Sequence, residues 1–284
     1  MGEKDLSEKI LVDYNDVFAD ILNVCAFQGK EIVKPEDLEN TSVHAQYKAE
    51  DGRLHEEERD VAKYWKKKRT AIALYGVENQ NCVDNKMPLR IIGYDGAAYR
   101  SQLIEERKEI VPVVSFVLYF GIEERWSEKK RTIKNIIKIP KELDCYVNDY
   151  KINVIEVAWL SDEELGLFKS DFGIVANYFV QKRKNKDYMP EDKREIKHVD
   201  AVLKMLSVMT KDNRFEEILY SKDGREVKTM CEVLDRAVKK GEDGERIRII
   251  KKKLEKGFDE KEISESLELE LEEVQNLIKT IKME

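Results

Sequence analysis

The chain has 284 residues, 42% of them hydrophobic, which is enough for one α/β domain and a smaller appendage. Its formal net charge of -7 at pH 7 excludes a general attraction to nucleic acid, so DNA binding would have to use local basic patches. The N-terminus is charged and has no signal-peptide pattern, and the longest apolar run, 110–122, is too short to cross a membrane. We therefore expect a cytoplasmic protein without membrane contacts.

Cysteine and histidine usage indicates which kind of metal site to expect. The four cysteines are widely spaced and form no CxxC pair, which argues against a zinc ribbon and against a disulfide framework. None of the three histidines has a second histidine at the i, i+4 spacing of a helical metal site. We expect reduced, mostly buried thiols, and oxygen ligands for any metal.

The N-terminal part of the chain predicts one amphipathic helix. Residues 7–27 carry apolar side chains at helical spacing with acidic residues between them, and Gly29 ends the helix. A short helical or looped stretch is expected at 35–40. The polar residues 41–58 show no clear period and are expected to be irregular.

A hairpin is predicted next. Two segments rich in β-branched and aromatic residues, 59–65 and 70–80, flank the basic turn 66–69. In an antiparallel hairpin, residues that face each other have numbers with a constant sum. A turn centred near residue 69 therefore makes residue 60 face residue 78.

The middle of the chain predicts the rest of a mixed sheet. Residues 94–109 have a helical pattern, and the almost fully apolar run 111–121 is typical of a central strand that is covered on both faces. A further strand is expected at 152–160. We predict an α/β fold with a mixed central sheet flanked by helices, and a helical C-terminal region.

The best candidate for a domain boundary is a charged stretch after residue 180. Helical patterns dominate 161–180, and the stretch 181–195 is rich in charge and contains a proline. From about residue 196 the pattern is helical throughout. We therefore divide the chain into an α/β domain, 1–185, and a helical region, 186–284.

The last part of the helical region, 257–282, contains two short helices around a break at 267–269, a spacing that resembles a helix-turn-helix unit. The second helix is acidic where it would meet DNA phosphates, because Glu270, Glu272 and Glu273 lie at its start. A helical hairpin that closes the C-terminus is therefore at least as good an interpretation.

The constellation that carries chemistry is Asp60, Glu78 and Gln80. Directly opposed Cβ atoms in a hairpin lie about 4.5–5.5 Å apart, so Asp60 and Glu78 can share a divalent cation. Strand alternation places Gln80 on the same face as Glu78. Two carboxylates around Mg²⁺ suit phosphodiester hydrolysis, because the metal activates water and stabilises charge on the phosphoryl oxygens. Solvated acids on a surface hairpin are the alternative explanation.

Two basic runs are candidates for DNA contact. The first comprises Lys66, Lys67, Lys68 and Arg69 in the hairpin turn, and the second is the run 182–186. The turn lies about 23 Å from Asp60 if the strand is straight, so it could contact DNA beyond the scissile phosphate. The alternative for both runs is a solvated turn or linker.

Five ordered segments between residues 10 and 160 resemble a known family. They are NDVFADILN, RDVAKYW, ALYGVENQ, MPLRIIGYDGAAY and VPVVSFVLYFG. Together they resemble the Rpn family of recombination-promoting nucleases and putative transposases. The resemblance implies a PD-(D/E)XK nuclease fold.

Roles for individual residues follow from this resemblance. It implies that Asp60 and Glu78 are metal ligands and that Gln80 replaces the lysine of the more usual E-x-K motif. It makes Asp16 the candidate for a further metal-binding acid, with Asp13 and Asp20 one turn away on either side.

Three further residues match the family segments: Arg90, Tyr94 and Tyr99. The resemblance makes Arg90 and Tyr99 candidates for DNA contact, with packing in the core as the alternative for the aromatic residues.

The expected function is Mg²⁺-dependent or Mn²⁺-dependent endonucleolytic cleavage of DNA. The rival is a DNA-binding protein with little catalysis, since Gln80 lacks the charge of a lysine. A third hypothesis is a structural or regulatory role centred on the C-terminal helices. The sequence leaves the oligomeric state open, homo-oligomers included.

Overall fold

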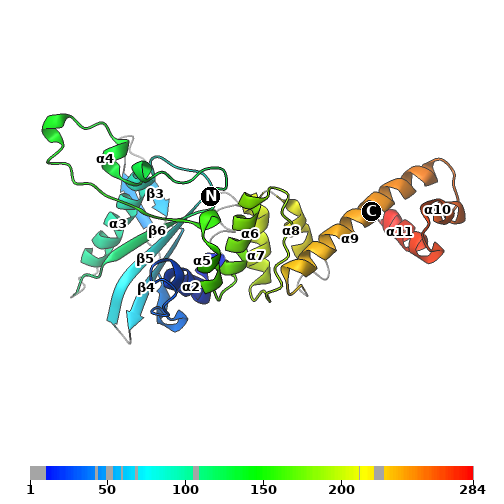
Figure 1. Cartoon of the computed structure of the whole chain (residues 1–284), viewed down its shortest axis with the longest axis horizontal. Coiled ribbons are helices and arrows are strands. Elements are labelled where there is room, and N and C mark those ends of the chain that lie inside the picture. Colours follow the sequence, from blue (N-terminus) through cyan, green and yellow to red (C-terminus); the bar gives the residue numbers. More distant parts are fainter. Residues whose placement is uncertain are drawn as a thin grey trace.

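A five-stranded mixed sheet lies at the centre of the α/β part of the chain (Figure 1). The computed structural model describes residues 11–41, 44–48, 54–58, 60–67, 70–104, 109–210, 212–220 and 227–283. The strands, in their order across the sheet, are β1 (Leu38–Asn40), β4 (Val61–Lys67), β5 (Thr70–Gln80), β6 (Val113–Tyr119) and β7 (Asn153–Glu156). The pairs β1–β4 and β4–β5 are antiparallel, while β5–β6 and β6–β7 are parallel. The predicted mixed sheet is confirmed.

The hairpin of β4 and β5 has the predicted register over most of its length. Val61 pairs with Val77 and Trp65 pairs with Ala73, as a constant sum requires. Between Trp65 and Lys66 the register shifts by one residue, which is a bulge in β5 near the turn. Because the bulge lies at the turn, it does not disturb the pairing at the other end of the hairpin.

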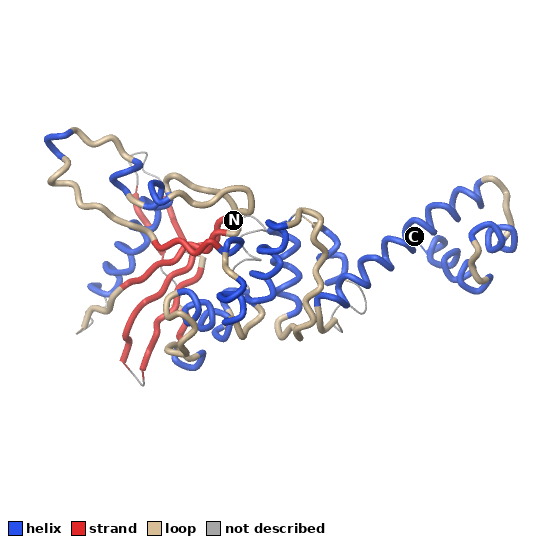
Figure 2. Tube along the Cα trace, viewed as in Figure 1, coloured by secondary structure: helices blue, strands red, loops and turns tan. Residues whose placement is uncertain are grey.

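Helices cover both faces of the sheet (Figure 2). One face carries α2 (Asn15–Cys25), α5 (Asp162–Leu167) and α6 (Phe172–Lys184), whose buried side chains share a cluster with Val61, Tyr75 and Phe116. The other face carries α3 (Met87–Ile104), which packs on the strand side chains that point away from that cluster. This two-sided cover explains why β6 is almost fully apolar, as predicted.

Three predicted elements differ from the structure. Residues 44–48 and 54–58, which were expected to be irregular, form a separate two-stranded sheet, β2 (His44–Lys48) and β3 (Leu54–Glu58). Helix α3 begins at Met87, seven residues before the predicted start at 94, and its end at Ile104 is followed by residues outside the described part of the chain. The strand expected at 152–160 is only β7, followed by a short 3-10 helix, η4 (Val157–Trp159).

The connection from β6 to β7 is long and is fixed to α3. It contains η2 (Glu128–Arg131), α4 (Ile133–Ile136) and η3 (Lys141–Leu143). Trp126 is buried against Tyr119, and the hydroxyl of Tyr150 donates to Asp95 of α3. The other oxygen of Asp95 accepts from Ser115 at 2.5 Å, so this buried carboxylate joins the connection, α3 and β6.

The hydrophobic core continues past residue 185. The cluster that contains α2 and the sheet also contains buried side chains of α7 (Val199–Thr210) and α8 (Asn213–Leu219), and it extends to Val233. The chain between α6 and α7 packs on this core, with Ile196 only 5% exposed. The division at 185/186 remains a prediction, but the core shows no break there.

The C-terminal end of α9 (Met230–Glu255) packs with α10 (Glu260–Leu267) and α11 (Leu271–Met283) in a separate hydrophobic cluster. Helix α9 leads away from the sheet to α10 and α11, as Figure 1 shows. The buried residues of this cluster are Ile250, Ile263, Val274 and Ile278. The predicted pair of short helices is confirmed, with Glu268 at a φ of 53° between them. In the described part of the chain, no helix has the length and apolar character needed to span a membrane.

Leu206→Ala should destabilise the sheet although Leu206 lies in α7. Both Leu206 and Ile263 are fully buried, but only Leu206 belongs to the core cluster that includes the sheet. All three tryptophans lie between residues 65 and 159, so their fluorescence reports unfolding of the sheet. We expect Leu206→Ala to lower the free energy of unfolding measured this way by about 2–5 kcal/mol.

Ile263→Ala is the matched control and should leave the tryptophan-detected unfolding transition unchanged. If Leu206→Ala does not change the tryptophan-detected unfolding transition, residues beyond 185 fold independently of the sheet.

Candidate functional site

Asp60 lies at the end of the hairpin and is bound to the neighbouring strand. Its Oδ2 accepts a hydrogen bond from the backbone N–H of Asn79 at 2.8 Å, and the Asn79 side-chain amide lies 3.5 Å from the same oxygen. The backbone pairing of β4 with β5 ends at Val61. Beyond that point the Asp60 carboxylate, instead of a backbone oxygen of β4, accepts the hydrogen bond of the Asn79 N–H. The Asp60 carboxylate is thereby held beside the backbone of the residue that follows Glu78.

Glu78 is buried and forms an ion pair with Arg90 of α3. Its side chain is 3% exposed, and Oε1 accepts from the Arg90 guanidinium at 2.5 Å. The same guanidinium group donates to the Tyr94 hydroxyl at 3.2 Å and lies 3.6 Å from Asp84. Glu78 therefore points to the face of the sheet that α3 covers.

The charge balance of this group favours a protonated arginine. Burial alone would lower the pKa of Arg90, but the carboxylate of Glu78 and the hydroxyl of Tyr94 outweigh it and hold the pKa above its usual value. A buried carboxylate needs such a partner, because an isolated charge in the interior is costly. Any cation that binds Glu78 must share it with Arg90 or displace Arg90.

Asp60, Glu78 and Gln80 carry oxygen donors, the type of ligand that hard divalent cations take. Gln80 follows Glu78 by two residues on β5, which places its side chain on the same face, and the side chain is partly exposed. Among the described residues, no group of three or more His, Cys, Asp or Glu side chains could hold a metal. Two carboxylates and one amide remain, and Mg²⁺ is usually held by one or two carboxylates with several waters.

Asp16 belongs to a different group. It lies on α2, which covers the face of the sheet opposite to α3. Its carboxylate pairs with Lys197 at 2.6 Å and with Nε2 of His198 at 3.1 Å, and the His198 ring stacks on Tyr14. Burial alone would raise the pKa of Asp16, but these two partners outweigh it and hold the pKa below its usual value. Its role as a metal ligand remains a prediction.

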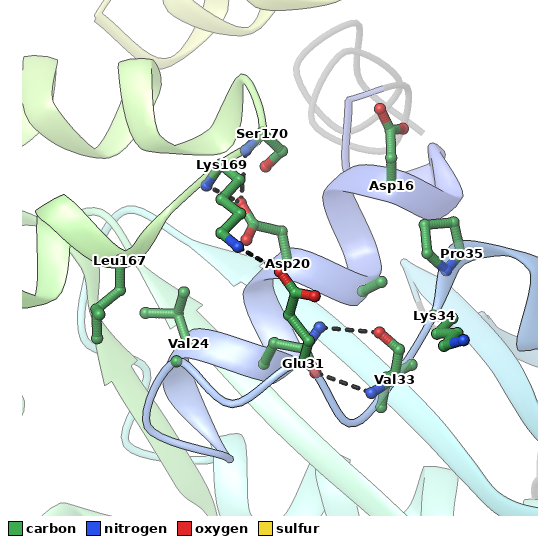
Figure 3. A pocket seen from close by; sticks show the side chains of 13 residues that line it. Asp16, Asp20, Val24, Glu31, Val33, Lys34, Pro35, Leu167, Lys169 and Ser170 are labelled. Carbon is green, nitrogen blue, oxygen red and sulfur yellow. Dashed lines mark hydrogen bonds and ion pairs between the residues drawn. The ribbon is translucent and has the colours of Figure 1, made fainter.

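Figure 3 shows the pocket that Asp16 lines together with Asp20. Oδ2 of Asp20 accepts from the backbone N–H of Lys169 at 2.9 Å and of Ser170 at 2.7 Å, and the Lys169 amine pairs with Glu31. Each carboxylate of this pocket except that of Asp16 therefore faces a donor within the pocket wall. The structure does not bring these acids together with Asp60 and Glu78.

Asp13, which lies just before α2, also has a partner. Lys63 of β4 is fully buried, and its amine donates to the backbone oxygen of Asp13 at 2.7 Å, to its carboxylate at 3.0 Å and to Asn40. Burial lowers the pKa of Lys63, and the Asp13 carboxylate opposes this effect. The group fastens the start of α2 to the strands β1 and β4.

The basic turn lies only partly within the described residues. Lys66 pairs with Glu39 of β1, and Lys67 is exposed at the end of β4. Lys68 and Arg69 lie outside the described residues. An exposed Lys67 is compatible with contact to a phosphate backbone, and this part of the prediction remains untested.

The second basic run is mostly engaged within the protein. Arg183 donates to the backbone oxygen of Ala158 at 2.7 Å and stacks on Trp159, and Lys184 pairs with Asp162. Lys182 instead lines a pocket with Asn81 and Cys82, the residues that directly follow Gln80. Lys182 therefore lies near the end of β5.

The two candidates on α3 occupy different positions. Arg90 contacts Glu78, whereas Tyr99 lies nine residues further along the helix, about 13–14 Å away along its axis. The Tyr99 hydroxyl accepts from the backbone N–H of Val113 at the start of β6, and Tyr99 is 39% exposed at the flank of α3.

Sequence reasoning missed two members of the site. Asn79 was treated as the spacer between Glu78 and Gln80, yet it binds Asp60. Asp84 lies in the turn before α3 and faces Arg90. Asn79 follows Glu78 directly, at the point where β5 no longer pairs with β4. An amide side chain in that position is a signal that could have identified it.

The fold and this site define a protein with the architecture of the PD-(D/E)XK enzymes, a mixed sheet with an acidic pair at one end of a central hairpin. Residues 30–213, more than half of the chain, match the family model described as "Putative transposase, YhgA-like". The chain belongs to this family, which confirms the resemblance drawn from the sequence. No curated protein and no solved structure matches the chain. The matched segment includes Asp60, Glu78 and Arg90 but excludes Asp16 and the C-terminal helices.

Arg90→Ala should destabilise the protein, because it leaves the buried Glu78 carboxylate without its arginine. We expect the free energy of unfolding to fall by about 2 kcal/mol, toward the low end for a broken buried pair since Arg90 is partly exposed. Saturating Mg²⁺ should raise the melting temperature of this variant more than that of the wild type.

The control is Lys86→Ala, which removes an exposed cation just before the same helix and should change neither quantity. If Arg90→Ala melts at the wild-type temperature, the ion pair does not support the site.

Proposed function

We propose that this protein is a metal-dependent DNA endonuclease and that Asp60, Glu78 and Gln80 form its catalytic site. The observation that carries the proposal is the hydrogen bond from Asn79 to Asp60, which fixes one carboxylate beside the strand position of the other. Family membership supports action on DNA, since transposases act on DNA ends. The protein's own contribution is the placement of these oxygen donors.

Mg²⁺ or Mn²⁺ is the proposed cofactor, bound by Asp60 and Glu78. When bound there, such an ion supplies a Lewis acid that activates water and stabilises charge on a phosphate. Gln80 would orient the attacking water or a phosphate oxygen through its amide, which can donate and accept hydrogen bonds. Asn79 keeps the Asp60 carboxylate in position by its backbone N–H.

Arg90 has a proposed place in this reaction as well. Its guanidinium contacts Glu78 and is 36% exposed, so it neutralises the buried acid while keeping part of its surface open to solvent. With Glu78 bound to a cation, the arginine would be available for a phosphate oxygen, to which guanidinium groups bind with two parallel hydrogen bonds. Arg90 would then supply the positive charge that Gln80 cannot provide.

A second function is favoured by the same ion pair. Because Arg90 already balances the charge of Glu78, the buried carboxylate has a counter-ion with no metal, as in a protein that binds DNA with little catalysis. A metal titration separates the two proposals. Stabilisation by millimolar Mg²⁺ or Mn²⁺ that Asp60→Asn abolishes supports the nuclease, and absence of binding supports the DNA-binding protein.

Asp60→Ala and Glu78→Ala should each reduce nicking of supercoiled plasmid in the presence of Mg²⁺ to background. Both carboxylates are needed to hold the ion, so loss of either removes the chemistry. Circular dichroism should show that both variants remain folded. Glu163→Ala, which removes an exposed acid on α5, is the control and should nick at the wild-type rate. Full activity in either site variant would remove that residue from the site.

Gln80→Lys and Gln80→Leu should have opposite effects on the initial nicking rate. Lysine keeps a donor at this position and adds a charge worth about 1 kcal/mol or more, so its rate should equal or exceed that of the wild type. Leucine has similar bulk but cannot donate or accept, so its rate should fall strongly. The rates are compared at one Mg²⁺ concentration. A leucine variant as fast as the wild type would show that Gln80 does not act on water or phosphate.

A further inference from the structure

The outer side of α3 is apolar although it faces solvent. Its inner side packs on the sheet through Met87, Ile91, Tyr94 and Ala98. A helix that covers a sheet normally presents charged and polar residues on its other side. The outer side of α3 instead consists of the exposed residues Leu89, Ile92, Gly93, Gly96, Tyr99, Arg100, Leu103 and Ile104, of which only one is charged. We call these eight residues the outer face of α3.

The exposed area of this face is large. The exposed fractions are 44% for Leu89, 41% for Ile92, 39% for Tyr99, 66% for Leu103 and 75% for Ile104. Five side chains of this size leave on the order of 500 Å² exposed, which matches the largest patches that monomers carry. A stable dimer buries about 800 Å² on each partner, so this helix alone can supply more than half of that area.

The residue order on this face suits pairing with a copy of itself. In an antiparallel pair of α3 helices around a two-fold axis at Gly96, Leu89 faces Leu103 of the other copy and Gly93 faces Tyr99. The two Gly96 residues at the axis allow the helices to approach closely. A Cβ built on Gly93 or on Gly96 contacts nothing within 4 Å in the chain itself, so this space is open.

Charge argues against other occupants. DNA phosphates require several cations, and the outer face of α3 has only Arg100. A charged peptide would leave its own charges against leucine, isoleucine and tyrosine side chains. An identical apolar face satisfies both conditions. In the same arrangement Arg100 faces Ile92 of the other copy, and its long side chain can lay its stem on that isoleucine and extend its charged head to water.

We propose that the chain forms a two-fold symmetric homodimer through antiparallel packing of the outer faces of α3. The dimer would also deepen the proposed function, on which this part rests. Each chain has one candidate site, and α3 carries Arg90 of that site on its inner side. Two copies joined through α3 place two sites in one particle, which is what cleavage of both DNA strands requires.

The first test is the mass of the full chain in solution, measured by sedimentation equilibrium without DNA or metal. The wild type should have twice the 33.3 kDa of one chain. Gly96→Gln should weaken the dimer about tenfold or more, because its side chain fills the crossing point. The same substitution replaces a helical glycine by a better helix former with nothing to clash with, so circular dichroism should show that the monomeric variant remains folded.

Gly166→Gln is the matched control. Gly166 is also an exposed helical glycine with open space around it, but it lies on α5 on the other face of the sheet. This variant should remain dimeric. A monomeric wild type at micromolar concentrations would overturn the proposal and leave the face to a different protein, and a Gly96→Gln variant that dimerises like the wild type would place the contact elsewhere.

A second test examines the register. Gly96→Cys should form a disulfide-linked dimer on mild oxidation, because the two Gly96 residues face each other at the axis, whereas Gly166→Cys should not. Cys82 and Cys145 are exposed and are first replaced by serine. Absence of the cross-link in Gly96→Cys overturns the antiparallel arrangement. Because neither test uses nuclease activity, the dimer can be refuted or supported whether or not the protein cuts DNA.

Conversion of plasmid to linear product connects the dimer to the proposed function. If the protein is a nuclease, the wild type should produce linear DNA early, and Gly96→Gln should accumulate nicked circles at a similar rate of first cleavage. Early linear product from monomeric Gly96→Gln would show that double-strand cleavage does not depend on this dimer.

Discussion

The backbone register between β4 and β5 determines which side chains can meet at the candidate site. A shift by one residue would turn Asp60 and Glu78 to opposite faces of the sheet, since successive side chains alternate. The apolar residues Val61, Tyr75 and Val77 hold the register because each must face the cluster under α2. The bulge between Trp65 and Lys66 absorbs the irregularity of the turn before it reaches this region. The acidic pair thus depends on hydrophobic packing on the opposite side of the strands.

The guanidinium of Arg90 is the cation that faces the buried acid at this end of the sheet. It balances a carboxylate that is nearly removed from water, so the buried charge of Glu78 has a counter-ion in the folded chain. A metal ion bound as proposed would have to compete with this existing partner for Glu78. Such competition would lower the affinity for the ion and would link metal occupancy to the position of α3, because the arginine belongs to that helix.

Much of the fold could be predicted from local patterns, and the contacts between distant segments could not. The hairpin register, the central strand and the C-terminal helices all follow from periodicity. The strands β2 and β3 were missed because HAQYK and LHEEE carry few apolar side chains. The start of α3 was missed because Pro88 and Gly93 resemble a loop. The partners of Glu78 and Asp16 depend on how helices dock, and no spacing along the chain encodes the pairing of Asp16 with Lys197.

The parallel order of β5 and β6 has a consequence for folding. Asp60 and Glu78 lie in one hairpin, and contacts within a hairpin form on about a microsecond scale. Arg90 reaches Glu78 only when α3 has crossed over, and β6 can pair with β5 only after that crossover is made. On a ribosome the hairpin leaves the exit tunnel before α3 is complete, so the two acids meet in a nascent chain that still lacks its arginine. During that interval Glu78 lacks the counter-ion that it has in the folded chain, so the order of synthesis separates the formation of the acidic pair from its neutralisation.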